Sequence, residues 1–312
     1  MKIAIIGSGG VGGYFGGRLA LAGNDVIFVA RGEHLKAIKE KGLKVKSTLG
    51  NFLIHPANAT NEISKIGTAD LIIFSVKAFQ VKGIVKELKP VIGKETTILP
   101  LENGLLTYEE ICEEIDKSNV IGGLCRIASK IESPGVINHT GIVPTIIFGE
   151  LDNSKTKRIT RFKEIFEKAE ISYEIPENIQ IERWKKFIGV CLSGLLALTR
   201  SPYGVLREIE GTRRIMFELL TEVYNVALKA GMKLEENVVD KTMEFIDSLP
   251  YEASASLASD ILSGKQSELD YQNGTVVNLG KKYKVDTPVN RFVYDCLLPM
   301  ELQARKNAKN NG

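Results

Sequence analysis

The first twelve residues constrain the fold of this chain more than any other stretch. Residues 3–6 are a short apolar run, typical of a buried parallel strand, and a G-x-G-x-x-G pattern follows at once. In such a pattern Gly7 permits a tight turn, Gly9 lets the backbone approach a pyrophosphate, and Gly12 lets the next helix pack close to the sheet. That helix presents its N-terminal N–H groups to the phosphates. The stretch predicts a dinucleotide-binding βαβ unit, with a flexible glycine loop as the alternative interpretation.

The second predicted strand bears on the choice of dinucleotide. A helical pattern over residues 11–22 stops at Gly23, and residues 25–30 form the next apolar strand. NAD-selective folds usually place an acid at the end of this strand to take the ribose hydroxyls. This chain has Arg31 there instead, and a guanidinium suits a 2′-phosphate through charge-assisted hydrogen bonds. We expect NADP in preference to NAD, unless Arg31 is an ordinary surface residue.

Further apolar runs continue the sheet. Strands are predicted at residues 70–76, 96–101, 120–127, 145–148 and 171–175, with helices at 80–88 and 156–169. In an open α/β sheet, ligands bind outside the carboxyl ends of the strands. Lys77 and Asn103 follow two of these strands, so both fall on the edge that would meet a cofactor or its substrate.

The second half of the chain has a different pattern. Apolar residues at helical spacing predict helices at residues 179–198, 212–230, 235–249, 254–262 and 268–283, and from 289 onwards. The predicted fold is α/β: a Rossmann-type doubly wound sheet at residues 1–177 for NADP, followed by an all-α domain at 178–312 for substrate and catalysis. Dehydrogenases commonly share this plan, with the active site between the domains. Such an analogy of fold does not by itself establish a function.

Charge and composition argue against several other classes of protein. A net charge of +3 does not indicate a nucleic-acid partner. The four cysteines are far apart and the three histidines are scattered, so neither a disulfide framework nor a metal site is expected. No apolar run approaches the roughly 20 residues of a membrane span, and Met1 leads directly into the first strand. We expect a cytoplasmic protein without membrane contact, and the long apolar faces of its helical half suggest a homodimer.

Two residues in the helical half could carry chemistry. Reduction of a carbonyl by a nicotinamide needs a group that neutralises charge on the carbonyl oxygen and a source of a proton. A partly desolvated lysine such as Lys186 can supply both, and a carboxylate such as Glu268 can orient it. Simpler alternatives stay open at this point. Lys186 follows Glu182 by four residues, as in a surface ion pair, and Glu268 could be a first-turn residue of its helix.

The motifs occur along nearly the whole chain, in the order found in one family. They are the glycine loop at residues 7–12, Arg31, Ser75-Val76-Lys77-Ala78-Phe79-Gln80, Glu102-Asn103-Gly104, Trp184-Lys185-Lys186, Ser256 with Asp260, and Glu268-Leu269-Asp270 with Asn273-Gly274. In this combination the chain resembles the ketopantoate reductases, also called 2-dehydropantoate 2-reductases. The resemblance implies reduction of 2-dehydropantoate to (R)-pantoate in pantothenate biosynthesis, with NADPH as the hydride donor.

The resemblance also implies roles for individual residues. Lys186 matches the catalytic lysine, which donates a proton to the ketone oxygen, and Glu268 matches the family's acid. The implied substrate contacts are Asn103, Lys186 and Ser256. The implied cofactor contacts are Gly7, Ser8, Gly9, Gly10, Val11, Gly12, Arg31, Lys77, Asn103, the backbone at Ala128, and Glu268.

The chain departs from the family pattern where the substrate is recognised. After the lysine the family has two asparagines on successive helical turns, but this chain has Val190 at the first position and Ser193 and Gly194 around the second. Tyr203 stands in place of a third asparagine. Because an apolar Val190 cannot bond a substrate hydroxyl, the sequence supports the reaction class more strongly than the exact substrate.

Three alternatives remain open from the sequence. The first is the same chemistry on another branched or hydroxylated 2-keto acid. The second is a non-catalytic NADP-binding sensor, although a sensor has no evident need for both Lys186 and Glu268. The third is a β-hydroxyacid dehydrogenase of the related two-domain kind, whose catalytic lysine lies in a motif different from Trp184-Lys185-Lys186.

Overall fold

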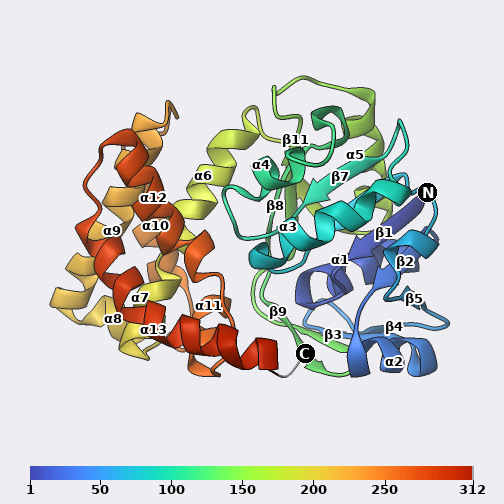
Figure 1. Cartoon of the computed structure of the whole chain (residues 1–312), viewed down its shortest axis with the longest axis horizontal. Coiled ribbons are helices and arrows are strands. Elements are labelled where there is room, and N and C mark those ends of the chain that lie inside the picture. The colour runs from blue at the N-terminus through green and yellow to red at the C-terminus, as the bar shows by residue number, and fades with distance from the viewer. Residues whose placement is uncertain (311–312) are drawn as a thin grey trace. The chain divides into compact units, whose positions relative to one another are not determined.

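The protein divides into two compact units in the computed structural model, which describes residues 1–310 (Figure 1). The first unit comprises Met1–Glu102 and Leu106–Ile179, and the second comprises Asn103–Leu105 and Gln180–Gly312. The first is α/β, and the second contains helices and no strand within residues 180–310, as the predicted fold class requires. The assignment of NADP to residues 1–177 and of substrate and catalysis to 178–312 stays a prediction.

A five-stranded parallel sheet forms the centre of the first unit, with the order β5-β2-β1-β6-β7. Its strands are β1 (Lys2–Ile6), β2 (Asp25–Val29), β5 (Asn58–Thr60), β6 (Leu71–Phe74) and β7 (Thr97–Pro100). Alternate residues of β1 enter apolar cores on opposite faces, so its continuous apolar run follows from burial on both faces. The strand order reverses between β1 and β6, at the switch point where such sheets bind ligands. The predicted doubly wound sheet is confirmed.

The first helix, α1 (Gly10–Leu21), packs against this sheet and against a second one. The second sheet has the order β4-β3-β10-β9 and consists of β3 (Leu43–Ser47), β4 (Phe52–Ile54), β9 (Ser129–Ser133) and β10 (Val136–His139). A Cβ added to Gly16 would lie 2.7 Å from Ile5 of β1, and one added to Gly13 would lie 2.7 Å from Ile137 of β10. The glycines inside α1 therefore let both sheets approach the helix axis.

The other elements of the first unit extend and connect these sheets. The strands predicted at residues 120–127, 145–148 and 171–175 do not continue the central sheet. They form a separate third sheet with the order β12-β11-β8, which consists of β8 (Gly122–Arg126), β11 (Thr145–Gly149) and β12 (Ser172–Glu174). The helical elements are α2 (Gly32–Lys41), η1 (Ile63–Lys65), α4 (Thr107–Cys112), η4 (Lys117–Asn119) and α5 (Lys157–Lys168). The helix predicted at residues 80–88 is only partly α-helical: α3 (Val81–Ile84) lies between the 3₁₀ segments η2 (Ala78–Gln80) and η3 (Val85–Val91). Pro90, within η3, lacks the N–H that an α-helix would use.

The second unit packs its helices around one apolar core. They are α6 (Ile179–Val190), α7 (Ser193–Thr199), α8 (Tyr203–Glu208), α9 (Glu210–Lys229), α10 (Val238–Ser248), α11 (Ser256–Leu262), η5 (Leu269–Tyr271), α12 (Asn273–Tyr283) and α13 (Pro288–Asn310). Two predicted helices are divided. The helix expected at 179–198 breaks after α6, where the carbonyl of Cys191 accepts a hydrogen bond from Nδ2 of Asn273 at 3.0 Å. The helix expected at 268–283 begins only at Asn273, so Glu268 is not a first-turn helix residue.

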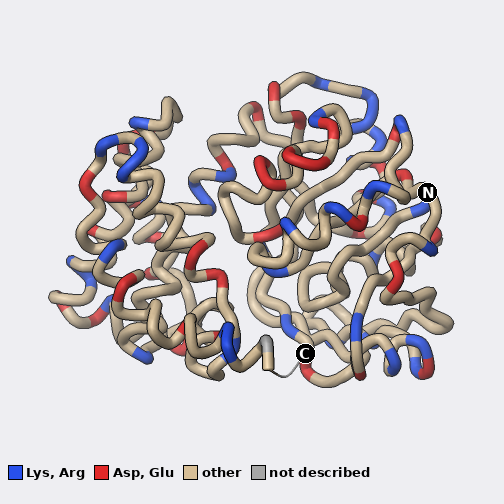
Figure 2. The backbone as a smooth tube through the Cα atoms, in the orientation of Figure 1, with Lys and Arg blue, Asp and Glu red and all other residues tan. Residues whose placement is uncertain are grey.

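Charged residues of both signs are interspersed along the chain in each unit, as Figure 2 shows. This distribution agrees with the small net charge of +3. Among the helices within residues 1–310, none is long and apolar enough to cross a membrane.

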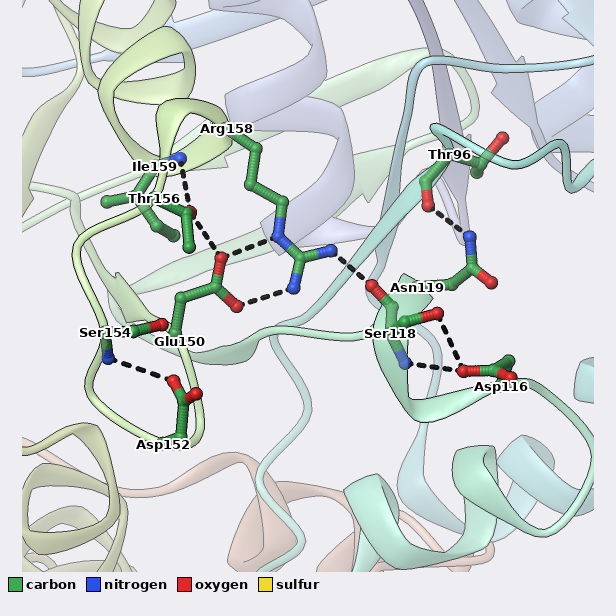
Figure 3. Close-up of polar contacts among 10 residues, drawn as sticks. All are labelled: Thr96, Asp116, Ser118, Asn119, Glu150, Asp152, Ser154, Thr156, Arg158 and Ile159. Carbon is green, nitrogen blue, oxygen red and sulfur yellow. Dashed lines mark hydrogen bonds and ion pairs between the residues drawn. The ribbon is translucent and has the colours of Figure 1, made fainter.

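A buried ion pair fixes the start of α5 to the third sheet (Figure 3). Glu150 directly follows β11, and its carboxylate accepts bonds from Nε and Nη2 of Arg158 at 2.6 and 2.5 Å. The hydroxyl of Thr156, the N-cap residue of α5, donates to the same carboxylate at 2.5 Å. Arg158 also donates to the carbonyl of Ser118 in η4. One guanidinium therefore joins α5, the end of β11 and η4.

We predict that Glu150→Ala lowers the free energy of unfolding by about 2–3 kcal/mol, because it leaves the partly buried Arg158 without its carboxylate partner. Denaturant titration followed by circular dichroism measures the change. The control is Glu174→Ala, which removes an exposed pair with Arg126 and should cost less than about 1 kcal/mol. Equal costs for the two variants would contradict the structural role of Glu150.

Candidate active site

The glycine loop lies at the carboxyl end of β1, beside that of β6. Gly7 has φ +96°, a left-handed conformation that favours glycine. Its carbonyl accepts a bond at 2.9 Å from Oγ of Ser75, the residue after β6. A Cβ on Gly12 would lie only 2.2 Å from the Gly7 oxygen, whereas one on Gly9 would meet no atom within 4 Å. Gly7 thus forms the turn, Gly12 lets α1 approach it, and Gly9 opens onto space that a ligand could enter.

Ser8 and Gly10 hold the loop to its neighbours. The buried hydroxyl and the N–H of Ser8 both donate to the carbonyl of Val29 in β2, each at 3.0 Å. A Cβ on Gly10 would lie 2.3 Å from the carbonyl oxygen of Ser129, whose hydroxyl donates to the Gly10 carbonyl at 2.9 Å. Because the Ser8 hydroxyl is used within the protein, its predicted cofactor contact falls to the backbone. Val11 is partly buried in the first turn of α1.

A histidine that the sequence analysis did not single out contacts the same loop. Nε2 of His34, in α2, lies 2.9 Å from the carbonyl oxygen of Ser8. Nδ1 accepts a bond at 3.0 Å from the N–H of Gly135, in the turn between β9 and β10. Burial lowers the pKa of the ring from its ordinary value of 6.5. His34 follows Arg31 by one helical turn, but both of its partners are backbone atoms, which no residue pattern marks.

The other predicted cofactor contacts of the first unit also lie at strand ends. Arg31 is exposed, follows β2 and is the N-cap residue of α2. Lys77 is the N-cap residue of η2, where its N–H donates to Oε1 of Gln80 at 3.1 Å. Ala128 is exposed between β8 and β9, and its carbonyl accepts a bond from the N–H of Thr140 at 2.9 Å. Their contacts with a cofactor stay predictions.

Asn103 follows β7 in the chain but belongs with the second unit. Its Nδ2 donates to Oε2 of Glu268 at 3.3 Å. Two residues later, the carbonyl of Leu105 accepts a bond from Nη2 of Arg183, in α6. Arg183 is only 9% exposed, and its Nη1 also donates to Oε1 of Gln180 at 2.7 Å. Two predicted site residues, Asn103 and Glu268, are therefore in contact, and Arg183, which the sequence analysis missed, holds the segment that carries Asn103.

Lys186 lies one turn after Arg183 on the same face of α6 and is partly buried. Among the described ion pairs, the lysine that meets Glu182 is Lys185 and not Lys186, so the surface pair considered for Lys186 is not found. Nζ of Lys185 lies 2.9 Å from Glu182 and 3.5 Å from Glu235. Within residues 180–310, no carboxylate lies at ion-pair distance from Nζ of Lys186, so its ammonium is not used in a structural pair.

Glu268 is held on both sides by α13. The residue before it, Ser267, donates its N–H and hydroxyl to Oε2 of Glu301 at 3.0 and 2.5 Å. Two residues after it, Asp270 accepts a bond from Nη2 of Arg305 at 2.7 Å. Glu301 and Arg305 both belong to α13, and Glu268 itself is only 2% exposed. The backbone on either side of Glu268 is therefore held by residues distant in sequence and not by a turn of α-helix.

The positions around the second missing asparagine are occupied by the protein itself. A Cβ on Gly194 would lie 2.3 Å from Oδ1 of Asn273. Ser193 donates its hydroxyl to the carbonyl of Val190 at 2.6 Å, across the break between α6 and α7. Any side chain at position 194 would therefore require Asn273 to shift from its present place.

Tyr203 and Ser256 differ in accessibility. Tyr203 is buried in the core of the second unit, and burial raises the pKa of its hydroxyl to about 12. Ser256 is exposed at the first residue of α11, where its hydroxyl can meet a ligand. The second unit thus carries an amide, a buried carboxylate, a lysine and an exposed hydroxyl, groups that can bind a small oxygen-rich molecule and transfer a proton to it.

Comparison with known proteins gives the same family for both parts of the chain. The family model "Ketopantoate reductase PanE/ApbA" matches residues 3–153, and its C-terminal counterpart matches residues 178–301. The chain is 30% identical over 308 residues to a 2-dehydropantoate 2-reductase of Pyrococcus abyssi, covering 98% of this chain and 100% of the relative. It is also 30% identical over 295 residues to the uncharacterized oxidoreductase YkpB of Bacillus subtilis, covering 94% and 97%. The crystal structure of a PanE/ApbA family ketopantoate reductase from Ralstonia eutropha is similar with a TM-score of 0.90 and 29% identity, covering 98% and 100%.

We predict different effects of an added methyl group at Gly12 and at Gly9. Gly12→Ala places Cβ against the carbonyl of Gly7 and should lower the free energy of unfolding by about 1–3 kcal/mol. Gly9→Ala has room, so it should change that free energy by less than about 0.5 kcal/mol and instead weaken the binding of a pyridine nucleotide. Denaturant titration and calorimetry measure the two effects. If both variants were equally destabilised, Gly9 would face the protein and not a ligand.

Proposed function

Because this chain belongs to the ketopantoate reductase family of pyridine-nucleotide-dependent oxidoreductases, we propose that it reduces a 2-keto acid with NADPH. The leading reaction is 2-dehydropantoate to (R)-pantoate, a step of pantothenate biosynthesis. The observation that carries the proposal is the contact between the Asn103 amide and the buried Glu268 carboxylate. Arg183 holds this segment to the face of α6 that bears Lys186, so one unit supplies the amide, the acid and the proton donor that the reaction needs.

The glycine loop and the residues at the strand ends are proposed to bind NADP. The N–H groups at the start of α1 suit its pyrophosphate, and the space beside Gly9 allows a close approach. We assign Arg31 to the 2′-phosphate, because its guanidinium is exposed at the end of β2. Lys77, Asn103 and the backbone at Ala128 are assigned to the remaining contacts. When bound, the reduced cofactor supplies the hydride.

Lys186 is proposed to supply the proton. An N–H of its ammonium donates to the ketone oxygen, so negative charge that develops there is neutralised as the C–H bond forms. The C=O π bond is replaced by one C–H and one O–H bond, and the lysine is left neutral until it regains a proton from solvent. Glu268, which accepts a bond from the Asn103 amide, is proposed to hold a substrate hydroxyl, and the hydroxyl of Ser256 donates to the substrate carboxylate.

A different 2-keto acid is the second candidate substrate. The side chain of Val190 offers no hydrogen bond to a hydroxyl, and Gly194 has no side chain that could offer one. Losing such contacts reduces discrimination in favour of a hydroxylated substrate. A branched, apolar 2-keto acid would suit a site with Val190 beside Lys186.

We further propose that the protein is a cytoplasmic homodimer, on the grounds of its composition and of the long apolar faces of its helical half.

The role of Arg31 predicts a preference between cofactors. NADPH should bind more tightly than NADH by roughly 1.5–3 kcal/mol, since hydrogen bonds to charged groups contribute that much. Arg31→Ala should abolish the preference and leave the affinity for NADH close to that of the wild type. Calorimetric titration with each cofactor measures both. Equal wild-type affinities, or a preference that survives in the variant, would rule out this role.

The role of Lys186 predicts a loss of turnover. Lys186→Ala should lower kcat for 2-dehydropantoate by roughly a hundredfold or more without changing the dissociation constant of NADPH. Lys185→Ala is the matched control, because Lys185 pairs with Glu182 and Glu235 and should keep kcat within a few-fold of the wild type. The rate is followed through the nicotinamide absorbance.

Two outcomes would count against the proposed function. If Lys186→Ala turned over as fast as Lys185→Ala, the lysine would be structural. If the wild type bound NADPH but reduced neither 2-dehydropantoate nor any other 2-keto acid, the sensor alternative would replace the reductase.

A further inference from the structure

We propose that His34 is a positioning residue for the pyrophosphate of the dinucleotide. The inference rests on the dinucleotide site proposed above and adds a residue to it. His34 acts through the peptide group between Ser8 and Gly9: by binding the carbonyl of Ser8, it turns the N–H of Gly9 toward the side on which the phosphates bind.

The two contacts of the imidazole determine which of its nitrogens carries the proton. The N–H of Gly135 can only donate, so Nδ1 of His34, at 3.0 Å, is the acceptor. The carbonyl of Ser8 can only accept, so Nε2, at 2.9 Å, carries the hydrogen. The ring is therefore neutral, with its hydrogen on Nε2. Its burial, which lowers the pKa, favours this neutral form.

Because a peptide group is planar, the bond from His34 to the Ser8 carbonyl also sets the direction of the Gly9 N–H. In a trans peptide the C=O and the N–H point in opposite directions, so binding the Ser8 carbonyl directs the Gly9 N–H away from His34. The N–H and the hydroxyl of Ser8 both donate to Val29, which ties Ser8 to β2 but leaves its own carbonyl to be bound by His34. Gly9 is the N-cap residue of α1, and a Cβ there would meet no atom within 4 Å. Its N–H therefore lies at the positive end of α1, where an anion is favoured.

The second contact of His34 anchors the ring and is less important for the loop. The turn at Gly135 is also held by its own carbonyl, which accepts a bond from the N–H of Lys44 at 2.9 Å. Gly135 also packs closely against Ala37 of α2, since a Cβ added to Gly135 would lie 3.0 Å from the Ala37 side chain. Loss of the bond at Nδ1 should leave this turn in place, whereas loss of the bond at Nε2 releases the Ser8 carbonyl.

Two substitutions separate the functions of the two ring nitrogens. His34→Gln keeps an N–H near the position of Nε2 and can still donate to Ser8. His34→Asn places its amide near the position of Nδ1 and cannot reach Ser8. Lys39→Gln, an exposed change on the same helix, is the control. For each protein, calorimetry gives dissociation constants for NADPH and for adenosine 2′-monophosphate, which lacks a pyrophosphate, and a thermal melt gives Tm.

We expect His34→Asn to weaken NADPH about three- to tenfold and His34→Gln less than about twofold, the range for one hydrogen bond. Binding of adenosine 2′-monophosphate should be the same in both variants and in the control. Equal weakening of NADPH by the two variants, or a parallel loss for the monophosphate, would overturn the proposal and leave His34 a purely structural residue. A wild type that binds no NADPH would overturn the proposed function as well, whereas unchanged NADPH affinity in His34→Asn would overturn this inference alone.

Discussion

The close approach of α1 to the turn after β1 is the contact on which the first unit depends. The carbonyl of Gly7 lies where any side chain at position 12 would be, and Oγ of Ser75, after β6, bonds to the same oxygen. Three elements therefore meet at one backbone carbonyl, and their meeting fixes the position of the positive end of α1. The loop is further tied to β2 through Ser8 and to α2 through His34. A phosphate that binds there meets N–H groups that are already oriented.

The second unit fixes its proposed catalytic groups through contacts between residues distant in sequence. α13 holds the residues on either side of Glu268, through Glu301 and Arg305. Arg183 binds the backbone beside Asn103, which brings the Asn103 amide to Glu268. Burial of a carboxylate is unfavourable unless it is paired or hydrogen-bonded. The Asn103 amide supplies one hydrogen bond to this buried acid, and the contacts of α13 hold the backbone on either side of it.

The elements that could be predicted from the sequence are those in which burial itself requires a run of apolar residues. β1, β2, β6 and β7 are buried on both faces, so each is an apolar run that can be recognised without a structure. β9, with the sequence SKIES, has one apolar residue and is largely exposed, so it leaves no such signal. The break after α6 depends on Asn273, which bonds to the carbonyl of Cys191 from a distant part of the chain. His34 and Arg183 were missed for a related reason: their partners include backbone carbonyls, and no residue pattern marks those.

In the proposed reaction a hydride passes from a nicotinamide to the keto carbon of a 2-keto acid. It is tested most directly with NADPH that carries deuterium at C4, in the (4R) and (4S) forms separately. Each form is incubated with the enzyme and either 2-dehydropantoate or an apolar 2-keto acid. We predict that one of the two forms, and only one, transfers a single deuterium to C2 of the 2-hydroxy acid product, as detected by mass spectrometry. Product without deuterium from both forms, or no product although NADPH is bound, would contradict it.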